Sequence, residues 1–271
     1  MSVSPASAPS PRDRSIVRLE HVAKTFSNGT VALADLNLDV AEGEFLSLLG
    51  PSGCGKSTAL RIIAGLGEPT SGAVAWPKAM YDASGKPEAE IGFVFQEPTL
   101  MPWATVFHNV WLPLRLKGVS KAAARTRVAE ALEMVGLEKF SAAYPRELSG
   151  GMKMRVSIAR ALVTRPRLLL MDEPFAALDE ITRQKLNDDL LKLYKQFGFT
   201  VLFVTHSVFE SVHLSSRIVV MAARPGRVID DIAIEAPYPR DRAFRTSPLY
   251  AEYCRRVSDS LVAAIGATDH L

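Results

Sequence analysis

A glycine-rich loop near the start of the chain constrains the fold more than any other feature. The segment Gly50-Pro-Ser-Gly-Cys-Gly-Lys-Ser-Thr58 fits the phosphate-loop pattern G-x-x-x-x-G-K-[ST]. A short apolar run at residues 44–49 predicts a strand before it, and residues 56–66 predict a helix after it that ends near Gly67. A strand, a glycine-rich turn and a helix in this order predict a site for a nucleotide phosphate at the helix N-terminus.

The residue types in this loop each have a use in phosphate binding. Gly50, Gly53 and Gly55 let backbone N–H groups point at phosphate oxygens without Cβ clashes, and the helix adds the positive end of its dipole. Lys56 is expected to contact the β- and γ-phosphates, and the Ser57 hydroxyl is expected to ligate Mg²⁺. The alternative is a glycine-rich turn that binds nothing. The other members of the predicted ATP-binding loop are Pro51, Ser52, Cys54 and Thr58.

A second glycine-containing turn, Leu148-Ser-Gly-Gly151, precedes a segment with a helical pattern. It offers a second anion-binding helix N-terminus, although one phosphate needs only one cradle. The economical explanation is that two copies pair head to tail, so that Ser149, Gly150 and Gly151 cover the phosphate loop of the other copy. The alternative is an ordinary Ser N-cap followed by a glycine turn.

The apolar run Leu168-Leu-Leu-Met-Asp-Glu173 ends in two carboxylates. Side chains alternate along a strand, so Asp172 is expected to hold Mg²⁺ through water while Glu173 acts as the base or positioner of the attacking water. Two further polar residues follow apolar strands: Gln96 can ligate Mg²⁺ and sense the γ-phosphate, and His206 can hydrogen-bond the γ-phosphate and the attacking water. Taken alone, each would be an ordinary side chain at a strand end.

Strands and helices alternate along the rest of the chain, which favours a mostly parallel sheet covered on both faces. Residues 180–197 predict a helix that ends at Gly198. Further apolar strands are expected at residues 16–21, 31–40, 91–95, 168–172, 200–205, 217–222 and 227–234.

The pattern becomes helical between about residues 97 and 150, which predicts a helical subdomain inserted into the α/β core. Ser120 is the expected N-cap of a helix that ends at Gly136. The expected divisions are a disordered tail at residues 1–14, one domain at residues 15–235 and a C-terminal extension with weak helical character at residues 236–271.

The composition of the chain argues against several classes of protein: nucleic-acid-binding, disulfide-rich, membrane-spanning and secreted. The chain has 271 residues, 48% of them hydrophobic, and a net charge of +3 without a Lys/Arg block, so nothing predicts a nucleic-acid arm. Two cysteines imply no disulfide framework and favour a reducing cytoplasm. No run approaches the roughly 20 apolar residues of a membrane span, and the first residues lack the apolar stretch of a secretory signal.

The order of phosphate loop, Leu-Ser-Gly-Gly turn and apolar Asp-Glu strand resembles the ABC-type ATPases, and the similarity to ATP-binding subunits of ABC transporters covers roughly residues 16–235. This resemblance implies an α/β fold with a P-loop NTPase core, an N-terminal antiparallel β subdomain and an inserted helical subdomain. It also implies ATP hydrolysis with ATP and Mg²⁺ as cofactors. Under it, Phe26 stacks on adenine, Asp179 crosses the dimer interface, and Gln96 and His206 are the family's glutamine and histidine.

Two positions depart from the common pattern of this family. Met152 stands where many members have Gln, and Phe26 stands where Tyr is common. Neither change removes a phosphate ligand, because backbone amides and Ser149 supply those contacts and a phenyl ring still stacks. Met152 is expected to change how the site between two copies packs.

The resemblance also implies partners: a second ATPase subunit, either a copy of this chain or a paralogue, a transmembrane permease that the helical subdomain contacts, and, indirectly, an extracytoplasmic solute-binding protein. It places the chain at the cytoplasmic face of the membrane and implies no nucleic acid. The apolar run Leu100-Met-Pro-Trp103 predicts a partner contact, and the alternative is that it packs internally.

Three segments, Gln96–Trp103, Met171–Glu180 and Ala223–Arg227, are similar to the nitrate/sulfonate/taurine-type importers, which include thiamine-precursor and bicarbonate-like systems. They predict an importer ATPase that works by ATP-driven closure of a dimer. Three alternatives remain: the ATPase of an ABC exporter, a non-transport ABC ATPase of DNA repair, chromosome organisation or translation, and a plain P-loop kinase or GTPase.

Overall fold

The computed structural model describes residues 14–80 and 90–266, and the expected disordered tail lies outside the described residues except for Arg14. The strands are β1 (Ser15–Thr25), β2 (Val31–Ala41), β3 (Phe45–Leu49), β4 (Ser71–Ala75), β5 (Ile91–Val94), β6 (Leu168–Asp172), β7 (Thr200–Thr205), β8 (Arg217–Ala222) and β9 (Arg227–Ala233). The helices are α1 (Lys56–Ile63), α2 (Val106–Leu116), α3 (Lys121–Met134), α4 (Gly150–Leu162), α5 (Glu180–Phe197), α6 (Val208–Leu214), α7 (Arg242–Arg245) and α8 (Pro248–Gly266), and two short 3-10 helices lie at Glu138–Phe140 and Pro145–Glu147.

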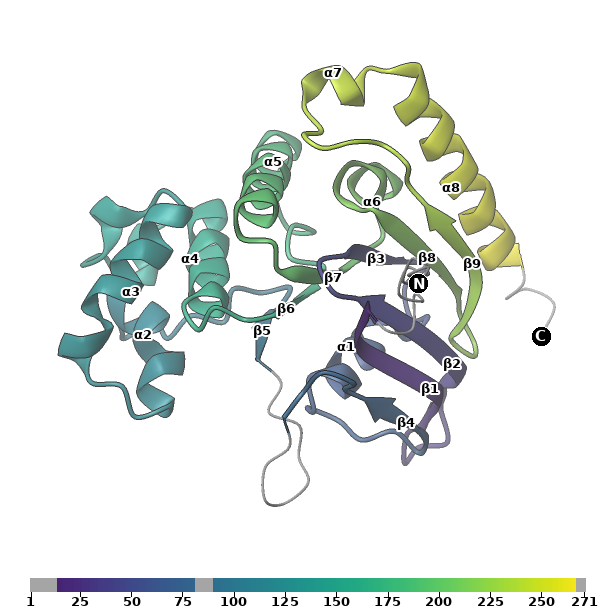
Figure 1. Ribbon diagram of the computed structural model, residues 1–271, viewed down its shortest axis with the longest axis horizontal. Coiled ribbons are helices and arrows are strands. Elements are labelled where there is room, and N and C mark those ends of the chain that lie inside the picture. Colours follow the sequence, from purple (N-terminus) through teal and green to yellow (C-terminus); the bar gives the residue numbers. More distant parts are fainter. Residues whose placement is uncertain (1–13, 81–89, 267–271) are drawn as a thin grey trace, which may run out of the picture.

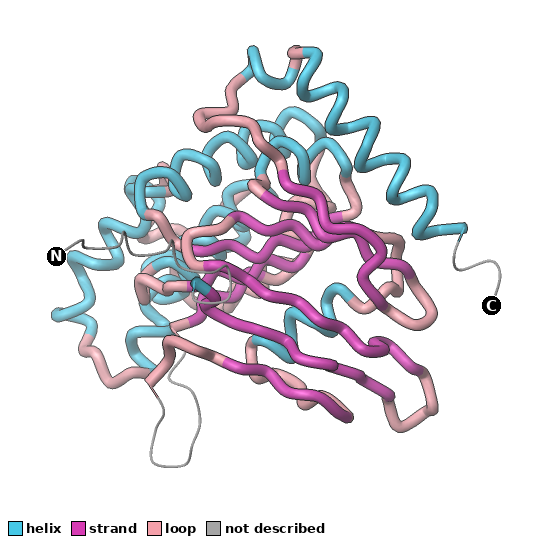
Figure 2. The backbone as a smooth tube through the Cα atoms, turned by 45° about the vertical axis from the view of Figure 1, so that its right-hand side comes forward, coloured by secondary structure: helices cyan, strands magenta, loops and turns pink. Residues whose placement is uncertain are grey.

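Two sheets form the centre of the molecule (Figures 1 and 2). The larger has the order β5-β6-β7-β3-β8-β9 and is parallel except for β9, which pairs antiparallel with β8. The smaller is antiparallel, with the order β2-β1-β4. The predicted α/β fold with an antiparallel β subdomain is therefore confirmed.

The large sheet is buried because its strands are apolar on both faces. Every residue of β3, β6 and β7 is buried, as expected for parallel strands covered by other elements on each side. Along β6, Leu168 and Leu170 pack with α1 and the small sheet, whereas Leu169 and Met171 face the helices on the other side. The alternation of side chains along each strand thus divides the interior into separate hydrophobic clusters.

The predicted helical subdomain is present as α2, α3 and the start of α4, which project from the sheet at the left of Figure 1. Ser120 caps α3, as predicted, by accepting a hydrogen bond from the Ala123 N–H. Thr105 caps α2 in the same way through the His108 N–H. Among the residues that the structure describes, no helix has the length and apolar character that crossing a bilayer requires.

Three elements differ from what the sequence pattern predicts. The edge strand β4 was not expected, because its short, half-exposed sequence SGAVA carries little apolar signal. The seven-residue helix α6 was also missed, since it is too short for a clear helical period. Helix α1 ends at Ile63 rather than near Gly67, because Gly65 takes a left-handed conformation (φ 68°) that terminates the helix.

The C-terminal segment is a well-packed part of the fold rather than a weakly helical extension. Helix α8 buries Cys254, Val257 and Ala264 in a cluster with β8 and β9. Arg240, only 3% exposed, precedes it and joins the segment to the core. Its guanidinium donates to the backbone carbonyls of Val212, His213, Ser215, Ile234 and Ala236.

We predict that Arg240→Met lowers the free energy of unfolding by about 2–4 kcal/mol, because several buried carbonyls lose their donor. Urea unfolding followed by circular dichroism measures the change. Arg242→Met is the control, since Arg242 is exposed and its loss should cost less than about 0.5 kcal/mol. Equal unfolding midpoints for the two variants would contradict a structural role for Arg240.

Candidate functional site

The glycine-rich loop lies at the carboxyl end of β3, which is hydrogen-bonded to β7 on one side and β8 on the other. Its compact shape depends on glycine. A Cβ on Gly55, whose φ is 90°, would lie 2.5 Å from Leu33 Cδ2 and 2.7 Å from the Ala32 carbonyl oxygen. A Cβ on Gly50 would lie 2.5 Å from the Met221 carbonyl oxygen. The loop is therefore held close to its neighbours and leaves its backbone N–H groups unshielded by side chains.

Lys56 is buried inside the loop, with 4% of its surface exposed. Its ammonium donates to the carbonyl oxygens of Gly50 (2.7 Å) and Pro51 (3.0 Å), and it lies 4.0 Å from Glu173 Oε1. The loop thus carries a fixed positive charge next to a carboxylate. This is the arrangement needed to bind a phosphate beside a residue that acts on water.

The predicted metal ligands Ser57 and Asp172 come together from α1 and β6. The Ser57 hydroxyl donates to Asp172 Oδ1 at 2.7 Å. Burial raises the pKa of the Asp172 carboxyl, so a nearby cation would favour its charged form. A hydroxyl and a carboxylate are the oxygen ligands that Mg²⁺ prefers, so the residues fit this ion.

Gln96 lies at the same edge of the sheet as Asp172, because it follows β5 and β5 runs parallel to β6. Its side chain is exposed. Within residues 14–80 and 90–266, no group of three or more His, Cys, Asp or Glu side chains could hold a metal by itself.

Glu173 and His206 form the second pair at this edge. His206, directly after β7, places Nδ1 3.1 Å from Glu173 Oε2. Glu173 has a positive φ of 45°, a strained conformation for a residue with a side chain, and its N–H donates to the Val204 carbonyl oxygen at 3.0 Å. Glu173 lies just beyond β6, so strand alternation does not reach it, and the two neighbouring carboxylates have different partners: Ser57 for Asp172 and His206 for Glu173. A carboxylate bonded to an imidazole can orient and deprotonate a water molecule.

The predicted second phosphate cradle lies at the N-terminus of α4. Ser149 caps α4 and accepts a hydrogen bond from the Met152 N–H at 3.3 Å. Asp179 caps α5 through the Thr182 N–H at 2.9 Å, a bond that lowers the pKa of its carboxyl. Among the described residues, no hydrogen bond or ion pair joins Ser149 or Asp179 to residues 50–58. One chain therefore brings together only part of the predicted site.

Four other predicted residues differ in how far they are exposed to solvent. The Phe26 ring is 45% exposed at the end of β1, with the Lys24 ammonium 5.7 Å from its centroid, so one face is open to stacking. The Cys54 thiol is fully buried in the core, and burial raises its pKa. Cys54 thus contributes its backbone to the loop, whereas Ser52 is exposed and Thr58 is half-buried.

Arg160 of α4 is a residue that the sequence analysis missed. Its guanidinium donates to the carbonyl oxygens of Pro98 (2.9 Å) and Thr99 (2.8 Å), which follow Gln96. The helix that begins at Ser149 is therefore tied to the segment after Gln96. An arginine within a helical pattern gives no local signal of such a contact, which joins residues about 60 positions apart.

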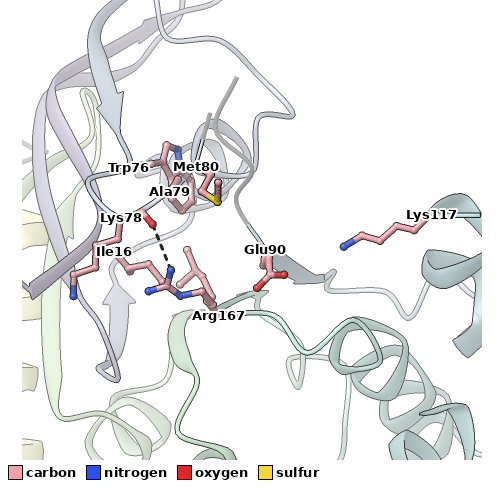
Figure 3. A pocket seen from close by; sticks show the side chains of 9 residues that line it. Ile16, Trp76, Lys78, Ala79, Met80, Glu90, Lys117 and Arg167 are labelled. Carbon is pink, nitrogen blue, oxygen red and sulfur yellow. Dashed lines mark hydrogen bonds between the residues drawn. The ribbon is translucent and has the colours of Figure 1, made fainter. Parts of the chain in front are cut away.

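A separate open cleft of about 490 Å³ lies at the opposite edge of the sheet (Figure 3). It includes Glu90 and Leu168, at the amino ends of β5 and β6. Of its three cationic side chains, Lys78 and Arg167 are paired with Glu42, and these bonds lower the pKa of that carboxyl, whereas Lys117 lies on the other side of the cleft (Figure 3). The cleft is thus unrelated to the phosphate loop.

Comparison with known proteins gives consistent matches. A family model described as ABC transporter matches residues 33–176. An uncharacterized ABC transporter ATP-binding protein of Methanocaldococcus jannaschii is 49% identical over 257 residues, which is 92% of this chain and 93% of that protein. The aliphatic sulfonates import ATP-binding protein SsuB of Bacillus licheniformis is 44% identical over 237 residues, 86% and 89% of the two chains.

A solved structure is also similar. It is the dimeric, post-hydrolysis state of the ATP-binding cassette MJ0796 bound to ADP and Pi, with a TM-score of 0.69 and 38% identity. The match covers 82% of this chain and all of the other.

We predict that Lys56→Ala weakens ATP binding at least about tenfold, because the loop loses its buried positive charge. Titration with a fluorescent ATP analogue measures the affinity, and circular dichroism checks the fold. Lys139→Ala, at an exposed position of the helical subdomain, is the matched control and should bind as the wild type does. Unchanged affinity of a folded Lys56→Ala protein would refute the assigned contact.

Proposed function

This chain belongs to the ABC transporter family as an ATP-binding subunit with ATPase activity, and we propose that it energises uptake of a small sulfonate-like solute through a separate permease. The family assignment confirms the resemblance drawn from the phosphate loop, the Leu-Ser-Gly-Gly turn and the Asp-Glu strand. Import of a sulfonate is supported by the 44% identity to the aliphatic sulfonates import protein and by the three importer-like segments of the sequence.

In the proposed site, the loop backbone and Lys56 bind the phosphates of ATP while Phe26 stacks on the adenine. Ser57, Asp172 and Gln96 would hold Mg²⁺, which neutralises phosphate charge when bound. The observation that supports this assignment is the meeting of Lys56, Ser57 and Asp172 at one edge of the sheet.

Hydrolysis is assigned to Glu173 and His206. The 3.1 Å contact between Glu173 Oε2 and His206 Nδ1 fixes the carboxylate, so that Glu173 can orient and deprotonate water next to the phosphates. Lys56 Nζ lies 4.0 Å from Oε1 of the same carboxylate.

Within one copy, no hydrogen bond or ion pair among the described residues joins Ser149 or Asp179 to the phosphate loop, and this supports pairing of two copies. Ser149, Gly150, Gly151 and Asp179 would contact the ATP held by the other protomer. A dimer is the form in which the similar cassette MJ0796 was solved. Each ATP would contact both protomers only in the closed dimer, so ATP binding would favour closure. Hydrolysis would remove these contacts and reopen the dimer. The partner can be a second copy or a paralogue.

The proposed permease contact is a groove between β5 and the helical subdomain. The groove measures about 510 Å³ and is lined by Phe93, Phe95, Leu112, Leu116 and Arg160, among others. Trp103, 77% exposed, belongs to the nearby apolar run, whereas Leu100 of that run packs against the core. Arg160 connects the groove to the helix that begins at Ser149. Motion of a bound permease segment would thus reach the interface between the two ATPases.

This arrangement would place the chain peripherally at the cytoplasmic face of the membrane. An extracytoplasmic solute-binding protein would deliver the cargo to the permease, and no nucleic acid takes part.

We predict that Glu173→Gln binds ATP with near wild-type affinity but hydrolyses it at least about 100-fold more slowly, because the amide cannot accept a proton from water. Size-exclusion chromatography with ATP should show a stable dimer of the variant. Phosphate release measures the rate. Turnover close to that of the wild type would exclude Glu173 as the residue that activates water.

The cargo and direction are tested by growth of a deletion strain on single sources of sulfur, nitrogen or thiamine precursor. We expect a defect confined to an aliphatic sulfonate as sulfur source, rescued by the wild-type gene but not by Glu173→Gln. Trp103→Ala should rescue poorly through lost permease contact, whereas Phe140→Ala, another exposed aromatic of the helical subdomain, should rescue fully. Normal growth of the deletion strain on every source would favour the exporter or non-transport alternatives.

A further inference from the structure

Glu210 is a buried carboxylate that the proposed hydrolysis site leaves unused. It lies in the first turn of α6, and only 8% of its surface is exposed. A Glu three residues after a Ser N-cap usually bonds back to the N–H of that Ser. Here the Ser207 N–H donates to Thr205 Oγ1 at 3.0 Å instead, and the Thr205 hydroxyl donates to Glu210 Oε2 at 2.6 Å. The Glu210 carboxylate thus holds Thr205 directly and Ser207 through the Thr205 hydroxyl, and these two residues flank His206.

The other oxygen of the Glu210 carboxylate faces α5. Asn187 Nδ2 lies 3.5 Å from Oε1, and the Arg183 Nε lies 4.0 Å from it. This Nε is buried and makes no hydrogen bond in the structure. A buried carboxylate costs free energy unless it is paired, so arrangements that keep Arg183 and Thr205 beside it are favoured.

Arg183 extends the connection to the loop that precedes Asp179. Its Nη2 donates to the Leu178 carbonyl oxygen at 2.9 Å. Leu178 itself packs beside the Ser149 turn, since a Cβ on Gly150 would lie 3.6 Å from Leu178 Cδ2. Polar contacts therefore run from the residues around His206, through Glu210 and Arg183, to the loop proposed to face the second protomer.

We propose that Glu210 and Arg183 are positioning residues that couple this loop to His206. When a second copy fixes residues 175–179, Arg183 keeps its place beside Glu210, and Glu210 holds Thr205 and Ser207 so that the imidazole stays against Glu173. Each ATP site would then hydrolyse efficiently only when the protomers are correctly paired. The inference rests on the proposed function, because it requires the assigned role of His206 and the pairing.

The test compares Glu210→Gln, Arg183→Gln and the double variant in the full chain. Each single change should lower kcat roughly three- to thirtyfold, a range typical of residues that carry coupling. The KM for ATP should stay within about twofold, since neither residue contacts the proposed nucleotide site. The double variant should be no slower than the slower single variant, because both changes break the same connection.

Epistasis with His206 separates positioning from a general structural effect. In a His206→Ala background, Glu210→Gln should change kcat by less than about twofold, because its route of action is already lost. Glu44→Gln is the control, as Glu44 is a half-buried carboxylate, 3.4 Å from Arg217 Nη1 at the amino end of β3. It should leave kcat unchanged. Thermal unfolding checks that each variant folds. If Glu210→Gln does not fold, the comparison is made with Arg183→Gln alone.

Equal losses of kcat in the wild-type and His206→Ala backgrounds would overturn the coupling, as would unchanged kcat in both single variants. In these cases His206→Ala alone remains slow, so the proposed function stands. Near wild-type kcat of His206→Ala would instead refute the role of His206, and this inference would fall with it.

Discussion

The parallel pairing of β6, β7 and β3 is the constraint on which the rest of the site depends. Parallel strands bring their carboxyl ends to one edge, so the polar residues that follow them must meet. The loop after β3, the Asp172–Glu173 pair at the end of β6 and His206 after β7 are all placed in this way. The contact of Ser57 with Asp172 joins residues 115 positions apart and exists only because the strands lie in this order.

The same edge combines rigidity with local strain. Fully buried strands with core packing on both faces fix the backbone beneath the site, and the glycine loop is pressed against residues 32 and 33 of β2. This support allows Glu173 to keep a positive φ just beyond the end of β6. Asp172 then lies against Ser57, while Glu173 lies between Lys56 and His206.

The peripheral elements form two sets of proposed contacts, one with a second ATPase subunit and one with a permease. Toward a second ATPase, the Ser149 turn and the loop before Asp179 pack on each other and connect through Arg183 to Glu210. Toward a permease, the groove beside Phe95 connects through Arg160 to the helix that starts at Ser149. The first connection begins at the turns that would complete the ATP site of the other copy, whereas the second reaches the last turn of the helix that Ser149 caps. These contacts give a physical route from the binding of a partner to the hydrolysis of ATP.

The sequence by itself determined the phosphate loop, the buried strand before Asp172 and Glu173, the cap at Ser120 and the family, because each depends on residue types within a short window. It did not show the edge strand β4, the short helix α6 or the burial of α8, whose local patterns are weak. Only the tertiary structure brought Arg160 to Thr99 and Arg183 to Glu210. Such contacts join separate elements, and no local pattern encodes which side chains will meet once the strands pair and the helices pack.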